Sequence, residues 1–168
     1  MENPGRARWC PWIMLLSMLL PGAALAQGSG SGVTLNVMVE QERVVTNEKG
    51  EKEKRRVAAT RVVPGDEVIY TIHYRNGSDE PAENVSITIP IARETTYVAN
   101  SARGAGTLIT YSVDGGAHFA DPGRLLVGSR DGHRRPATAA DYTHIRWKFI
   151  EPLPPGAAGA VSYRARLN

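Results

Sequence analysis

Apolar and polar residues alternate with a period of two along several short segments of this chain. Between Glu67 and Arg75, the even positions are all apolar or aromatic, whereas most of the odd positions are polar. The same alternation recurs in residues 84–89, 144–149 and 161–167, and in residues 33–39, where Met38 weakens the contrast between the two faces. A period of two predicts β-strands with one buried face and one wet face.

The segments between these strands carry residues that favour turns rather than helix caps. Examples are Pro64-Gly65-Asp66, Asn76-Gly77-Ser78-Asp79, Asp114-Gly115-Gly116 and Pro154-Pro155-Gly156. After the first 26 residues, no twelve-residue window shows an amphipathic helical pattern. We therefore predict an all-β, antiparallel, two-layer sandwich of about seven to nine strands. The leading core candidates are Tyr70, Tyr74, Ile87, Trp147 and Phe149.

Residues 48–56 form the most charged segment of the chain and contain no apolar side chain. Acidic and basic residues interleave there, which would cancel much of the field that a nucleic-acid or acidic-surface patch requires. We interpret the segment as a solvated hairpin tip that links residues 43–46 with residues 57–60. The net charge of +3 likewise implies no nucleic-acid partner.

Residues 1–26 have the three parts of a secretory signal peptide. Arg6 and Arg8 precede the apolar run Trp12 to Leu20, and the segment ends in Ala24-Leu25-Ala26. These small residues predict cleavage between Ala26 and Gln27. An uncleaved membrane anchor is the alternative, but the run is shorter than the roughly 20 apolar residues that span a bilayer.

Cleavage would leave 142 of the 168 residues, enough for one domain. We assign residues 27–32 to a flexible glycine and serine linker and residues 33–168 to the sandwich domain. The sole cysteine, Cys10, lies in the signal peptide, so the mature chain would contain no disulfide. We expect a periplasmic or extracellular protein without stable membrane insertion.

Several strings, taken in order, resemble one bacterial family. They run from Val63-Pro64-Gly65-Asp66-Glu67 through Asn76-Gly77-Ser78-Asp79 to Thr96-Tyr97-Val98-Ala99-Asn100-Ser101, with Pro152-Leu153-Pro154-Pro155-Gly156 near the end. The pattern is similar to the bacterial conserved-repeat domain known as domain of unknown function eleven, and covers roughly residues 33–168. The resemblance implies an exported immunoglobulin-like sandwich of the cell envelope. Because that family has no defined catalytic site or cofactor, it implies no catalytic, cofactor or metal residue here.

Candidate chemistry outside this resemblance is sparse. Ser112-Val113-Asp114-Gly115-Gly116-Ala117-His118-Phe119 is similar to the aspartate-box hairpin of sialidases, but a single copy cannot build their repeated propeller, so we interpret it as a turn. The chain's four histidines form no close pair, and four loop aspartates lack the spacing of an EF-hand calcium loop. These residues are His73, His118, His133 and His144, and Asp114, Asp121, Asp131 and Asp141. Residues 123–140 form either a binding loop or, as we favour, a long solvated connection.

The sequence thus predicts a non-enzymatic, exported envelope domain that binds an unknown envelope protein or surface component, for instance along an exposed sheet edge. A carbohydrate-binding module is one alternative, with Tyr97, Tyr111, Trp147 or Tyr163 as a sugar platform if these side chains face solvent. An exported hydrolase is another, and it would require His118 or His133 to lie beside two carboxylates in a pocket.

Overall fold

The computed structural model describes residues 32–128 and 132–168. Within these ranges the chain forms eleven β-strands and two short 3-10 turns. The predicted signal peptide, its cleavage site at Ala26 and Gln27, and nearly all of the predicted linker lie outside the described residues. No helix within the described ranges is long and apolar enough to cross a membrane.

The first sheet is the larger layer of the molecule, and all of its strand pairs are antiparallel. Its main path follows the order β2-β1-β3-β11-β5, and the short β6 also pairs with β11. The strands are β1 (Val33–Thr46), β2 (Lys52–Ala58), β3 (Glu67–Asn76), β5 (Thr95–Tyr97), β6 (Arg103–Gly104) and β11 (Ala158–Leu167).

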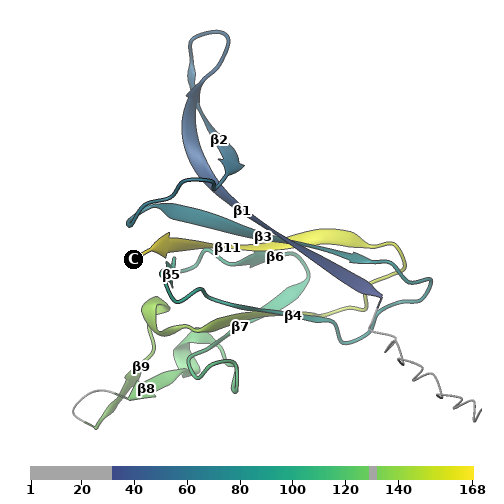
Figure 1. Ribbon diagram of the computed structural model, residues 1–168. Coiled ribbons are helices and arrows are strands. Elements are labelled where there is room, and N and C mark those ends of the chain that lie inside the picture. The colour runs from purple at the N-terminus through teal and green to yellow at the C-terminus, as the bar shows by residue number, and fades with distance from the viewer. Residues whose placement is uncertain (1–31, 129–131) are drawn as a thin grey trace, which may run out of the picture.

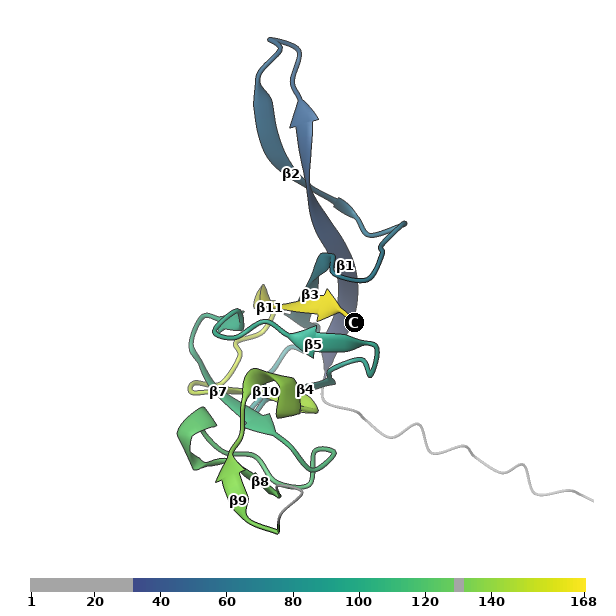
Figure 2. The ribbon, with the colours of Figure 1, turned by 90° about the vertical axis from the view of Figure 1, so that its left-hand side faces the viewer.

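The second sheet has three antiparallel strands in the order β4-β10-β7 and packs beneath the first (Figure 2). Its strands are β4 (Ser86–Pro90), β7 (Thr107–Ser112) and β10 (His144–Phe149). The connection from β7 to β10 contains a separate two-stranded ribbon and both 3-10 turns. These are β8 (Leu126–Gly128), β9 (Arg134–Pro136), η1 (Pro122–Arg124) and η2 (Ala139–Asp141). The chain is therefore an all-β, immunoglobulin-like antiparallel sandwich. The alternation predicted the antiparallel two-layer sandwich, and the resemblance implied its immunoglobulin-like form.

The core lies between the two sheets and follows the predicted parity. Trp147 and Tyr163 are its largest fully buried side chains, and Ile72, Ile87 and Ile145 are buried with them. The Trp147 indole also donates a hydrogen bond to the carbonyl of Arg103 at 3.1 Å, which satisfies its N–H inside the core. Two of the five leading core candidates, Tyr70 and Tyr74, are only partly buried and pack against the core, whereas Ile72 between them on the same face is fully buried.

Asn76 is a buried polar residue that joins two loops. Its side-chain amide donates to the carbonyls of Glu80 and Leu153, both at 2.9 Å, and to that of Pro154 at 3.2 Å. Its Oδ1 accepts from the Ser78 hydroxyl at 2.6 Å. The string Asn76-Gly77-Ser78 is therefore more than a turn, since it holds the β3–β4 and β10–β11 connections together at one end of the sandwich.

The structure differs from two of the sequence predictions, and the first difference concerns the predicted hairpin. β1 and β2 do form a hairpin, and it projects out of the sandwich as an arm (Figure 1). However, its turn occupies only residues 47–51, and residues 52–56 already belong to β2. Charged side chains can line a strand whose two faces are both in solvent, which is why the absence of apolar residues did not mark a loop.

The second difference concerns the faces of the strands. Val33, Leu35, Val37 and Val39 alternate as predicted, yet only Val33 is partly buried and the other three are exposed. Ile69, by contrast, is buried although it lies on the face of β3 that was predicted to be exposed to solvent. The prediction of one buried face for every strand was therefore wrong for β1.

Candidate interaction surface

Among residues 32–128 and 132–168, no strand pairs with one edge of β1 along the first half of the strand, which we call the open edge. Residues 33–40 pair with β3 on one side, whereas β2 pairs only with residues 40–46 on the other side. The Gly32 carbonyl accepts from Gly77 on the β3 side at 2.6 Å, and the Val39 carbonyl accepts from Ala59 on the opposite side at 3.0 Å. Because backbone groups alternate in direction along an antiparallel strand, the N–H and C=O groups of Val33, Leu35 and Val37 point to the open edge.

The inward-facing row of the same segment is apolar and exposed. Leu35 and Val37 are each 49% exposed, and Val39 is 38% exposed. In register they lie opposite Tyr74, Ile72 and Tyr70 of β3, so they continue the core face of the sheet. They remain exposed because the three-stranded second sheet covers β3 and β11 but not β1. Large apolar side chains that gather in this way mark interaction sites.

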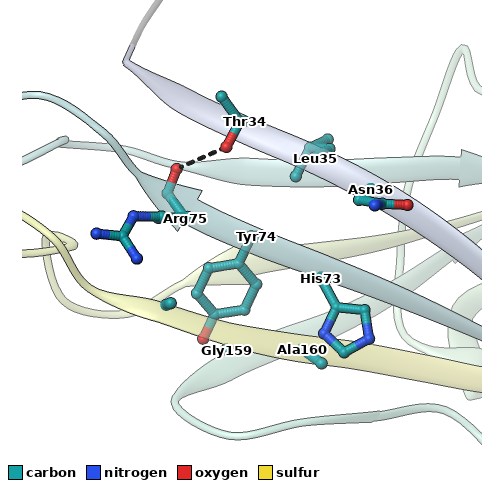
Figure 3. A pocket seen from close by; sticks show the side chains of 9 residues that line it. Thr34, Leu35, Asn36, His73, Tyr74, Arg75, Gly159 and Ala160 are labelled. Carbon is teal, nitrogen blue, oxygen red and sulfur yellow. Dashed lines mark hydrogen bonds between the residues drawn. The ribbon is translucent and has the colours of Figure 1, made fainter.

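A shallow depression of about 620 Å³ lies at the start of this edge (Figure 3). It is lined by three registered rows from β1, β3 and β11, one of which contains Leu35, Tyr74 and Gly159. A Cβ atom at Gly159 would lie only 2.4 Å from the Tyr74 hydroxyl, so glycine is required for the phenol ring to lie across β11. Packing of Tyr74 against Gly159 within the sheet therefore sets the shape of the depression.

Residues 33–39 carry no charge, in contrast to the arm that follows. At the base of the arm, Arg164 donates to a Glu42 carboxylate oxygen at 2.6 Å, and this hydrogen bond lowers the pKa of Glu42. Gln41 is buried there and donates to the Arg61 carbonyl at 3.4 Å. The open edge is thus a neutral, apolar segment bounded by an ionic one.

The aspartate-box string forms a hydrogen-bonded turn. The Ser112 hydroxyl donates to Asp114 Oδ1 at 2.7 Å, and the same oxygen accepts from the His118 backbone at 3.0 Å. His118 Nδ1 lies 2.6 Å from Asp114 Oδ2, and these contacts hold the pKa of Asp114 well below its usual range. The structural interpretation of this string is confirmed.

The other candidate residues are spread over the molecule. His118 is 88% exposed and lies beside one carboxylate, that of Asp114, whereas the hydrolase alternative required two in a pocket. His73 is exposed on β3, and His144 contacts the Thr143 hydroxyl at 3.2 Å. Across residues 32–128 and 132–168, no three His, Cys, Asp or Glu side chains gather in a way that could hold a metal ion. Asp131 lies outside the described residues.

The aromatic residues considered for a sugar platform all face the core. Tyr97, Tyr111, Trp147 and Tyr163 are buried, which is the predicted orientation for Trp147 and Tyr163. Tyr97 and Tyr111 share a hydrogen bond of 2.9 Å between their hydroxyls, and burial, together with this bond, raises the pKa of Tyr111. None of the four side chains offers a face to a ligand in solvent.

The connection across residues 123–140 is held by an ion pair. Arg135 donates from both terminal nitrogens to Asp141, at 2.8 and 2.7 Å, and Thr138 adds a backbone bond of 2.7 Å. Behind this pair, Tyr142 stacks on Tyr111 with ring centroids 4.5 Å apart. The described part of the connection therefore packs against one end of the core, with Leu125 buried there, so it is not the wholly solvated connection that we predicted.

Sequence reasoning proposed contact along an exposed sheet edge but did not predict which strand provides that edge. The alternation in residues 33–39 predicted a strand but gave no sign that its apolar face lacks a partner. The signal that marks it is the combination of an uncharged segment and the weak contrast introduced by Met38. The chain matches no protein-family model, no curated protein and no solved structure.

Proposed function

We propose that this chain is an exported, non-enzymatic domain of the bacterial cell envelope or periplasm, and that it works by contacting a protein or surface component through the open edge of β1. The observation that carries the proposal is the exposed apolar row of Leu35, Val37 and Val39 beside unpaired backbone groups. The predicted secretory signal in residues 1–26 supports export, and the resemblance to the conserved-repeat family supports an envelope location.

The edge has the two properties that strand addition requires. Unpaired N–H and C=O groups supply affinity for an extended partner strand, and alternate side-chain positions supply specificity. Soluble proteins usually protect such edges with charges, proline, bulges or a covering loop. Residues 33–39 contain neither charge nor proline, which favours an edge that is used for contact.

Site-specific photo-crosslinking in living cells tests this proposal. We expect a photoreactive residue at Val37 to give a discrete crosslinked product in the envelope fraction. Leu108 is the matched control, because it is an exposed apolar residue (59%) on β7 in the other sheet. We expect the same probe at Leu108 to give little product.

The same cells test export. We expect the processed chain to begin at Gln27, as read by mass spectrometry of its N-terminus, and to leave the cytoplasm. Retention of residues 1–26, or equal crosslinking from Val37 and Leu108, would contradict the proposal.

A further inference from the structure

The usable part of the open edge is short and has a defined end. Toward the arm, Ala59 already donates to the Val39 carbonyl, so an added strand cannot extend to Val39. Val33, Leu35 and Val37 remain, each with its N–H and C=O directed outward. An added strand therefore contacts about five residues, a length of roughly 17 Å.

The side chains around this stretch restrict what covers it. The inward row needs an apolar neighbour, because Leu35 and Val37 are half exposed and continue the core face. The residues that signal cleavage would leave just before β1 are Gln27-Gly28-Ser29-Gly30-Ser31, which include no apolar side chain. These residues would supply no apolar side chain to the row, which favours an occupant from another molecule.

The stretch is complementary to itself. In an antiparallel pair formed by two copies about a two-fold axis, each strand faces its own sequence in reverse. Such pairing fails when like charges are placed opposite each other. Residues 33–39 are Val-Thr-Leu-Asn-Val-Met-Val, which place apolar residues at every inward position and no charge at any position.

We propose that two copies of this chain pair antiparallel along β1 about a two-fold axis at Leu35, joining their first sheets into one. Leu35 lies opposite Leu35 of the second copy, and Val33 lies opposite Val37. A register centred on Asn36 would instead place Val33 against Val39, where Ala59 is already bound. Because it names the partner of the open edge, this inference rests on the proposed function.

The expected dimer is weak. The pairing supplies about six backbone hydrogen bonds and one continuous apolar strip. A strand pair of this length buries less than the roughly 1,200 Å² of a standard interface. We therefore expect a dimer that forms as the protein concentration rises from about 1 µM to about 1 mM.

Charge pairs at Leu35 give the sharpest test, because a two-fold axis places this residue opposite itself. In sedimentation experiments we expect the unaltered chain to dimerise, whereas Leu35→Lys alone and Leu35→Glu alone stay monomeric. An equal mixture of the two variants should regain the dimer, because unlike charges then lie opposite. Leu35 is half exposed, so both variants are expected to fold, as circular dichroism will verify.

Disulfide formation tests the register. In a Cys10→Ser background the introduced thiol is the only one in the chain. Directly opposed residues lie about 5.5 Å apart between Cα atoms, within disulfide range, so Leu35→Cys should crosslink between copies. The two Val37→Cys positions would be displaced by four residues, about 13 Å, and should crosslink no more than a Leu108→Cys control.

Each outcome decides the proposal. Dimerisation that is lost in the single charge variants and regained in their mixture supports it, as does selective crosslinking at Leu35→Cys. A monomer at every concentration, or equal crosslinking at Leu35→Cys and Val37→Cys, overturns it. If the chain is monomeric while Val37 still crosslinks to a different envelope component in cells, self-pairing is wrong and the proposed function stands.

Discussion

The two strands that pair with β3 carry the same alternation of apolar and polar residues, but their apolar side chains differ in burial. On one side, Val161 of β11 lies in register with Ile72 and is 1% exposed. On the other side, Val37 of β1 lies in register with the same Ile72 and is 49% exposed. Both are valines on the same face of the same sheet, so their difference comes from what lies beneath the sheet.

The comparison separates strand formation from burial. Alternation is sufficient to place a residue on one face of a sheet, but burial requires a second layer opposite that face. Here the second sheet has three strands, and it covers β3 and β11 while β1 extends beyond it. The uncovered row therefore stays in contact with solvent and is available for contact with a partner.

Removal of the central side chain of the covered region is expected to have the largest effect. Trp147→Ala deletes a fully buried indole and its hydrogen bond to the Arg103 carbonyl. We expect the free energy of unfolding to fall by about 3–5 kcal/mol, as measured by urea denaturation followed by circular dichroism. Leu108→Ala, at an exposed position, is the control and should change the value by about 0.5 kcal/mol or less.

The two valines beside Ile72 sharpen the comparison with an identical substitution. Val161→Ala leaves a cavity in a packed core, so we expect a loss of about 2 kcal/mol in the free energy of unfolding. Val37→Ala removes the same atoms from a solvated position and should cost about 0.5 kcal/mol or less. Both values come from denaturation at low protein concentration, where a weak dimer is dissociated. Equal losses at the two positions would mean that β1 is covered in solution.

Much of the fold could be predicted because local patterns decide it. The alternation in residues 67–75 and 144–149 identified the strands that became β3 and β10, and Trp147 and Phe149 were correctly placed in the core. The turn at Pro64-Gly65-Asp66 also forms, with the Asp66 carboxylate accepting from the Val63 amide at 3.0 Å. Strand parity and turn chemistry act over a few residues and are therefore visible in the sequence.

Features that depend on distant residues could not be predicted in the same way. The exposure of Leu35 depends on how far a sheet built from residues 86–149 extends. The burial of Asn76 depends on carbonyls 77 and 78 residues away in the sequence. No local pattern distinguishes an asparagine in a turn from one that joins two loops, so the candidate surface emerged only from the arrangement of the sheets.

The connection that precedes β10 shows that a loop can cover apolar side chains in the way that β1 lacks. There the connection before β10 is held by Asp141, and Tyr142 packs on the buried Tyr111. Bonds from Arg135 and Thr138 lower the pKa of Asp141 below its ordinary value of about 4. The ionised carboxylate therefore contributes stability that is fully present above this ordinary pKa, and it is lost as the pH falls through the lower folded value.

Asp141→Asn tests whether this cover depends on the ion pair. At pH 7 we expect a loss of about 1 kcal/mol in the free energy of unfolding, limited by solvent screening because Arg135 is 46% exposed. The difference between the variant and the unaltered chain should shrink as the pH falls below about 4, because Asp141 of the unfolded chain then takes up a proton, whereas Asp141 of the folded chain stays ionised until its lower pKa is reached. Urea denaturation at a series of pH values measures it. A difference that stays constant from pH 7 to low pH would assign the effect to packing rather than charge, and the cover at this end would then be apolar throughout.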